Sequence, residues 1–130
     1  MKFTLKIKIK ATAKEIYKTW LDSEGHTKMT GGKVTASDKI GGIFSAWDGY
    51  ITGKNISLEP YFGIKQTWRT TQFIRSNEDS ILELFFEETN GETEITLIHS
   101  NLPEDGGHYK KGWDKHYFQP MKIYFSNSNL

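Results

Sequence analysis

Two dipeptides, Asp48-Gly49 and Asn90-Gly91, constrain the fold of this chain more than any other feature of its sequence. Both central residues of a two-residue β-hairpin turn need positive φ angles, which Asn, Asp and Gly adopt more readily than other residues. The segments beside these turns, such as 81–89 and 92–100, alternate apolar with polar residues. Residues 33 to about 100 are therefore predicted to form sequential antiparallel strands joined by tight turns.

The first ten residues alternate in the same way. Phe3, Leu5, Ile7 and Ile9 fall on one face of an extended chain, and lysines and a threonine fall on the other. This period of two predicts a half-buried strand. Solvated lysines that discourage pairing at a sheet edge explain the polar face better than a binding patch does.

Two short helices are predicted after this strand. Thr12 and Glu15 have the spacing of a capping box, in which each side chain accepts a hydrogen bond from the other residue's backbone N–H. A second short helix, capped by Asp22 or Ser23, is predicted to run through Met29 and to be ended by Gly31-Gly32, because a glycine commonly follows the last helical turn.

After residue 103 the period changes to that of a helix. Large side chains recur every three or four positions and share one side of a long C-terminal helix: Tyr109, Trp113, Tyr117, Met121 and Tyr124. Pro120 lies inside this run and cannot donate a hydrogen bond to the carbonyl of His116. A kink is therefore predicted at this proline.

Composition excludes several classes of function. The chain has no cysteine, so it holds neither a disulfide framework nor a zinc–thiolate site. Its formal net charge of +1 does not indicate the concentrated basic surface that binding of nucleic acid requires. No apolar run approaches the roughly 20 residues of a membrane span, and the alternating N-terminus differs from a signal peptide. We expect one domain over residues 1–130, in the cytoplasm, with no nucleic-acid partner.

Two motifs for cofactors and metals are incomplete. The stretch from Gly49 to Asn55 resembles a phosphate-binding loop, but it is one residue short and Asn55 replaces the hydroxyl that would bind magnesium. A bend or a close neighbour in a strand explains Gly53 better. The histidines form no metal-binding pair, and Asp105 with His108 comes nearest. We expect no metal and no cofactor.

His99 is the most informative ionisable residue. It has the same parity as Ile95 and Leu97 along its strand, so its ring is predicted to point to the same side as these apolar residues. Such a histidine is either a core residue with satisfied hydrogen bonds or a polar group that lines a pocket. No Gly-x-Ser-x-Gly nucleophile motif is present, and no catalytic residue is assigned.

The large side chains of the expected helix and strands can fill a core or line an apolar ligand site. Aromatic residues make up 14% of the chain, and the polar tips of Trp and Tyr suit a pocket with a few hydrogen bonds. Spacing alone does not separate the two interpretations. The candidate lining residues are Trp20, Phe44, Trp68, Phe86, His99, Trp113, Tyr117, Met121 and Tyr124. Arg69 alternates with Trp68 and is predicted to face the other side of the sheet, as a surface residue or ion-pair partner.

Four stretches carry a resemblance to a known family: GGIFSAWDGYITGKNISLEP at 41–60, IKQTWRTT at 64–71, TEITLIHSNLP at 93–103 and GWDKHYFQPMKIYF at 112–125. The chain resembles the family of activators of heat-shock chaperone ATPases, within the START-like, helix-grip superfamily. The resemblance implies an α+β fold in which a curved antiparallel sheet of six to seven strands wraps around a long C-terminal helix. It also implies two short helices after the first strand, and a cavity between sheet and helix.

Three functions follow from these features. The first is a binding module that holds a small hydrophobic or amphipathic ligand between the sheet and the C-terminal helix. The second, which rests on the resemblance alone, is a protein-interaction module of the stress response, a co-chaperone-like activator of a heat-shock chaperone ATPase. The third is a cavity-based hydrolase or cyclase, which would need polar groups that converge inside, such as His99 with Tyr117 or Asp48.

Overall fold

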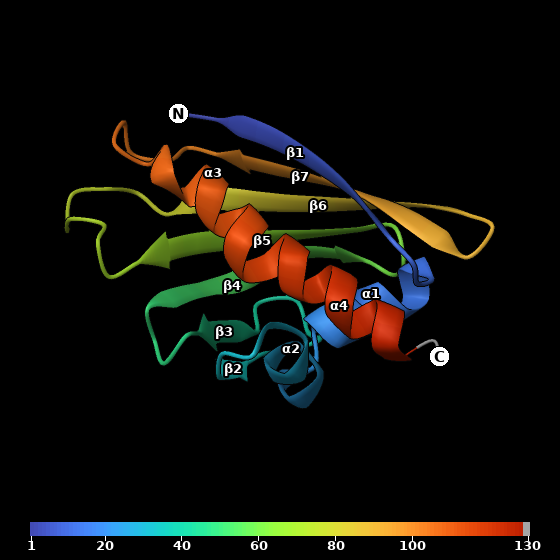
Figure 1. Ribbon diagram of the computed structural model, residues 1–130. Coiled ribbons are helices and arrows are strands. Elements are labelled where there is room, and N and C mark those ends of the chain that lie inside the picture. Colours follow the sequence, from blue (N-terminus) through green and yellow to red (C-terminus); the bar gives the residue numbers. More distant parts are fainter. Residues whose placement is uncertain (129–130) are drawn as a thin grey trace.

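A seven-stranded antiparallel sheet and a long C-terminal helix form the fold in a computed structural model that describes residues 1–128 (Figure 1). The strands are β1 (Phe3–Ile9), β2 (Val34–Thr35), β3 (Ile43–Ala46), β4 (Ile51–Glu59), β5 (Gly63–Thr70), β6 (Ser80–Thr89) and β7 (Glu92–Ser100). Their order in the sheet is β1-β7-β6-β5-β4-β3-β2. Residues 129 and 130, the end of the expected domain, lie outside the described residues.

The helices lie on one side of this sheet. Two short helices, α1 (Ala13–Trp20) and α2 (Ser23–Thr30), follow β1. The C-terminal helix comprises α3 (His108–Trp113), the π-helical turn η1 (Asp114–Phe118) and α4 (Gln119–Ser128), and it crosses the sheet diagonally (Figure 1). The predicted fold class, the strand number and the two short helices are confirmed.

The hairpin turns centre on the predicted dipeptides. Asn90 and Gly91 have φ angles of 53° and 80° between the paired residues Thr89 and Glu92. Asp48 and Gly49 have φ angles of 55° and 87°. The preceding residue, Trp47, also has a positive φ angle of 54°, which its sequence position did not predict. This conformation is uncommon for a residue with a large side chain.

The predicted capping signals are present at both short helices. Thr12 accepts a hydrogen bond from the backbone N–H of Glu15, and the Glu15 carboxylate accepts one from Thr12, which completes the capping box. Asp22 caps α2 by accepting a hydrogen bond of 2.7 Å from the N–H of Gly25. Gly31 ends α2 with a φ angle of 84°.

The irregularity expected at Pro120 takes the form of a π-helical turn. The N–H of Gln119 donates to the carbonyl of Asp114, five residues earlier, so the turn before the proline is wider than an α-helical one. The extra residue shifts the buried side of the helix by one position. Phe125 is therefore fully buried, whereas Tyr124, expected on the buried stripe, is only half-buried.

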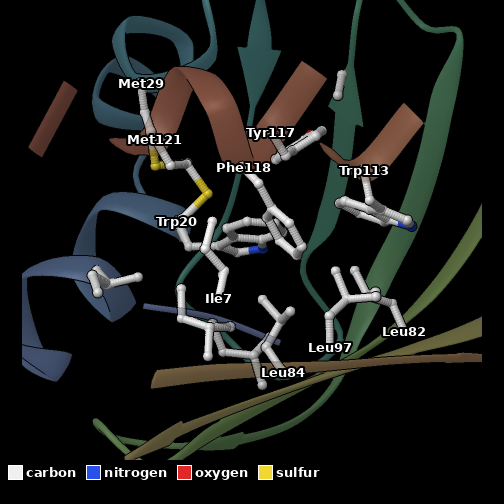
Figure 2. Close-up of a cluster of buried hydrophobic side chains, with 14 of the residues drawn as sticks. Ile7, Trp20, Met29, Leu82, Leu84, Leu97, Trp113, Tyr117, Phe118 and Met121 are labelled. Carbon is white, nitrogen blue, oxygen red and sulfur yellow. The ribbon is translucent and has the colours of Figure 1, made fainter. Parts of the chain in front are cut away.

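Side chains from the helices and the sheet fill the interior. Figure 2 shows Trp20 and Phe118 between the C-terminal helix and the leucines of β6 and β7, Leu84 and Leu97. These leucines are completely buried, as is Met121 of α4. Every buried side-chain nitrogen or oxygen among the described residues has a hydrogen-bond partner. The space beneath the helix is therefore a packed core with satisfied polar groups.

The Gly49–Asn55 stretch belongs to the hairpin and β4, whereas a phosphate loop would open a helix. A Cβ atom at Gly53 would overlap the carbonyl oxygen of Thr67 and the ring of Phe44, so this glycine permits a close approach, as predicted. Arg69 forms the predicted ion pair, at 2.8 Å from Asp79.

Candidate functional site

A cleft of about 600 Å³ opens between the C-terminal helix and the β3–β4 hairpin. Its floor and walls are mostly aromatic and apolar, and its polar groups come chiefly from the helix. The lining residues are Trp47, Tyr50, Ile51, Trp68, His108, Tyr109, Lys111, Gly112, Trp113, Lys115, His116 and Tyr117.

Four buried aromatic residues form the floor of the cleft. Tyr109, Trp113 and Tyr117 follow one another at intervals of four residues, which places them on one face of the helix. The ring of Trp68, from β5, lies 5.0 Å from that of Tyr109 and 5.8 Å from that of Trp113. The rings of Trp113 and Tyr117 are 4.7 Å apart. Each ring is held by its neighbours, so the floor is a preformed aromatic surface.

The hairpin is linked to the helix at two places, once by a direct ring contact and once through the side chain of Gln72. The rings of Trp47 and His116 meet edge to face at a distance of 5.7 Å. The hydroxyl of Tyr50 donates to Oε1 of Gln72 at 2.8 Å, and Nε2 of His108 lies 3.2 Å from the same oxygen. His108 and His116 are eight residues apart, which corresponds to roughly 12 Å along a helix. The helical wall of the cleft lies between these two contacts.

Gly112 lies in the middle of this wall. Among the described residues, no atom outside its own helical turns lies within 4 Å of the position that a Cβ would occupy. A glycine inside a helix costs roughly 0.5–1 kcal/mol relative to alanine. No close neighbour therefore requires a glycine here, and the absence of a side chain leaves open space at this point of the cleft wall.

A directed chain of hydrogen bonds lies beneath the floor. Trp113 Nε1–H donates to Nδ1 of His99 at 3.0 Å, and Nε2 of His99 lies 2.8 Å from Oγ of Ser80. Ser80 donates in turn to the carbonyl of Trp68. Since Nδ1 accepts, Nε2 carries the proton and donates to Ser80. Burial lowers the pKa of His99 to about 3, so its ring is neutral near pH 7.

His99 is therefore a core residue with satisfied hydrogen bonds, the first of the two predicted interpretations. Its side chain is completely buried, and both ring nitrogens are used within the core. Neither Tyr117 nor Asp48, its proposed catalytic partners, is hydrogen-bonded to it.

A second buried histidine holds the hydroxyl of Tyr117. Nδ1 of His26 donates to the carbonyl of Trp20 at 2.8 Å, which leaves Nε2 to accept from the Tyr117 hydroxyl at 3.2 Å. Burial lowers the pKa of His26 to about 4 and raises the pKa of Tyr117. Both groups are neutral near pH 7, and together they fix the orientation of the Tyr117 ring.

The structure brings three of the nine sequence-predicted lining residues to the cleft: Trp68, Trp113 and Tyr117. Trp20 and Phe44 instead border an internal space of only about 10 Å³. His99, Phe86 and Met121 are core residues, and Tyr124 lies half-buried on α4, beyond the cleft. Contact with a ligand stays a prediction for all nine residues.

Sequence reasoning missed the hairpin wall and the cationic rim. Trp47 reaches the helix because of its positive φ angle, which strand alternation does not reveal. Lys111 and Lys115 were indistinguishable from other surface lysines. Gly112 offered a usable signal, because a glycine within an otherwise regular helical pattern needs a reason.

The described part of the chain has neither a cluster of metal-ligating side chains nor a long apolar helix. Within residues 1–128, no group of three or more His, Cys, Asp or Glu side chains is arranged to hold a metal ion. No helix within those residues is long and apolar enough to span a membrane.

Comparisons with known proteins agree with this fold. The chain is 26% identical over 129 residues to the activator of 90 kDa heat shock protein ATPase homolog from Dictyostelium discoideum. This match covers 97% of the chain but 34% of that protein, so the chain spans about a third of the relative's length.

Two solved structures illustrate the likeness in fold. An HSP90 activator from Plasmodium falciparum superposes with a TM-score of 0.87 at 20% identity, over 97% of this chain and 96% of that one. A protein from Mesorhizobium loti superposes with a TM-score of 0.84 at 15% identity over the full length of both chains. At such identities the likeness concerns the fold alone.

The family model described as Activator of Hsp90 ATPase homolog 1-like protein matches residues 10–126. This range includes both short helices, six of the seven strands and nearly all of the C-terminal helix. The chain belongs to the family of Activator of Hsp90 ATPase homolog 1-like proteins.

Proposed function

We propose that the cleft binds a small apolar or amphipathic molecule with a flat ring system. The observation that carries this proposal is the preformed aromatic floor beside the unfilled position of Gly112. A volume of about 600 Å³ lies within the roughly 300–1,000 Å³ of ligand pockets. The site lies at the open side of the helix, because the centre of the sheet–helix interface is filled.

The expected affinity is modest. A two-ring aromatic compound that buries roughly 250 Å² of apolar surface gains about 6 kcal/mol at 25 cal/mol per Å². Lost translational and rotational freedom offsets part of this gain. Dissociation constants for unspecialised aromatic probes should therefore lie roughly between tens of micromolar and several millimolar.

Substitutions at Gly112 test the proposal with little risk to the fold. The neutral fluorescent probe N-phenyl-1-naphthylamine should bind saturably to the native protein. Gly112→Leu should abolish saturable binding by filling the cleft, whereas Gly112→Ala, the matched control, should only weaken it. Circular dichroism checks that both variants are folded. The proposal fails if the native protein does not bind the probe, or if Gly112→Leu binds it as tightly as the native protein does.

The family assignment favours a second function, the activation of a heat-shock chaperone ATPase. The curated relative carries this activity in its name, although the chain spans only about a third of that relative. Location in the cytoplasm and a role in the stress response would accompany this function. The ATPase rate of the Hsp90-type chaperone from the same organism, measured with increasing amounts of this protein, tests the idea. An unchanged rate at saturation would exclude it for this chain.

A further inference from the structure

The described residues that line the cleft include basic side chains and no carboxylate. Lys111 and Lys115 contribute two ammonium groups, and His108 and His116 contribute imidazoles. No Asp or Glu is among the described residues that line it. Building on the proposed function, we infer that the ligand carries an anionic group, such as a carboxylate, sulfonate or phosphate, attached to its flat ring system.

The two lysines are placed at the mouth of the cleft. They are four residues apart, so they share one face of the helix, and they flank Gly112 between the two contacts with the hairpin. Both side chains are exposed at the solvent side of the aromatic floor. An anion near these ammonium groups keeps its contact with water while the attached rings lie on Trp68 and Trp113.

Neither lysine forms an ion pair with a carboxylate of the described residues. The ion pairs found among the described residues involve Lys6, Lys28, Lys39 and Arg69, and none involves Lys111 or Lys115. The nearest acidic residue in the helix sequence, Asp114, accepts a hydrogen bond of 3.1 Å from Gln119. The two ammonium groups at the mouth of the cleft are therefore not held in ion pairs with a carboxylate of the described residues.

Aromatic floors also attract cations, so two effects compete for the sign of the ligand. A cation over an indole face gains from the ring quadrupole. In this cleft the same cation would lie close to two full positive charges, whose repulsion acts over a longer range than the quadrupole attraction. The lysines decide the preference in favour of an anion. The effect is local, because the whole chain has a formal net charge of only +1.

Competition among matched probes tests the inference. Three naphthalene derivatives share the ring system and carry substituents of different charge at position 2: 2-naphthalenesulfonate, 2-methylnaphthalene and (2-naphthylmethyl)trimethylammonium. Each is used to displace N-phenyl-1-naphthylamine from the native protein. We expect the sulfonate to bind roughly tenfold more tightly than the cation, with a preference that shrinks at high salt. Octanesulfonate carries a flexible alkyl chain in place of the flat ring system, and it should bind more weakly than 2-naphthalenesulfonate.

A pair of double variants assigns the preference to the cleft. Lys111→Gln with Lys115→Gln should weaken sulfonate binding about three- to tenfold and leave 2-methylnaphthalene unchanged. The control, Lys110→Gln with Lys122→Gln, removes the same charge from positions that do not line the cleft and should have little effect.

The outcomes separate this inference from the function on which it rests. If the neutral and cationic probes bind as tightly as the sulfonate, or if both double variants behave alike, the anionic ligand is excluded while a binding cleft remains. Tighter binding of octanesulfonate would exclude the flat ring. If none of the probes binds the native protein, or if Gly112→Leu does not affect them, both proposals fail.

Discussion

Replacing His99 by glutamine tests how the buried histidines link the stability of the fold to pH. Burial lowers the pKa of His99 from 6.5 to about 3 and that of His26 from 6.5 to about 4. Between these values and pH 6.5 the unfolded chain binds a proton at each histidine and the folded chain does not. The unfolded state therefore binds more protons, and the free energy of unfolding falls as the pH falls.

The size of the effect follows from the pKa values. Each pH unit below 6.5 costs about 1.36 kcal/mol per histidine until the folded state is protonated as well. From pH 7 to pH 5, each histidine thus lowers the free energy of unfolding by roughly 2 kcal/mol, and the two together lower it by roughly 4 kcal/mol. Such a loss is large beside a total stability of about 5–15 kcal/mol.

Glutamine is suited to this test because its amide can replace both hydrogen bonds of the imidazole. Its oxygen can accept from Trp113 and its nitrogen can donate to Ser80, without a proton that titrates. Urea unfolding of the variant His99→Gln is followed by circular dichroism at pH 7, 6 and 5. From pH 7 to pH 5, the free energy of unfolding of this variant should fall by about 2 kcal/mol, whereas that of the native protein should fall by about 4 kcal/mol.

Gly112→Ala serves as the control, since it changes the stability and keeps both histidines. Its free energy of unfolding should fall with pH as steeply as that of the native protein. A native stability that is constant between pH 7 and pH 5 would refute the reasoning, as would a variant His99→Gln with an unaltered pH dependence.

Three further substitutions test the packing and the caps. Gly53→Ala should lower the free energy of unfolding by about 3 kcal/mol in urea unfolding, because its Cβ would overlap the carbonyl of Thr67; a neutral result would mean that β4 can move away. Asn55→Ala should cost about 2–3 kcal/mol, since its buried amide donates to two backbone carbonyls; a cost below 1 kcal/mol would contradict this. Thr12→Ala should cost about 1 kcal/mol through loss of the capping box with Glu15, and an unchanged melting temperature would refute that role.

Local sequence signals were enough to predict the order and type of the elements. Alternation, two hairpin dipeptides and a capping box each act over a few residues, so they can be read without knowledge of the fold. The resemblance supplied the wrapping of the sheet around the helix. The exact side of the helix that is buried was less predictable, because the π-helical turn adds a residue and exchanges Tyr124 for Phe125.

The site was less predictable than the fold because its features depend on partners far apart in the sequence. Alternation placed His99 on the inner side of the sheet, but only the packed structure shows that Trp113 and Ser80 use both of its nitrogens. The same holds for Trp47, whose contact with His116 joins a hairpin to a helix 69 residues later. Alternation predicts the side of the sheet to which a side chain points. The burial of that side chain and the partners that it contacts depend on the packed tertiary structure.

Gly112 is both a residue of the C-terminal helix and a lining residue of the cleft. Its substitution by alanine distinguishes two roles of the glycine: leaving space in the cleft, or allowing the geometry of the helix. If the glycine serves only to keep the cleft open, Gly112→Ala should raise the free energy of unfolding by roughly 0.5–1 kcal/mol, since alanine restricts the unfolded chain and favours the helix. The same variant should bind N-phenyl-1-naphthylamine more weakly, because the added methyl group projects into the space beside Lys111 and Lys115. Urea unfolding and a probe titration on one preparation measure both effects. A variant that is less stable than the native protein would show instead that the helix needs the glycine for its own geometry, and the cleft would then be a by-product of the fold.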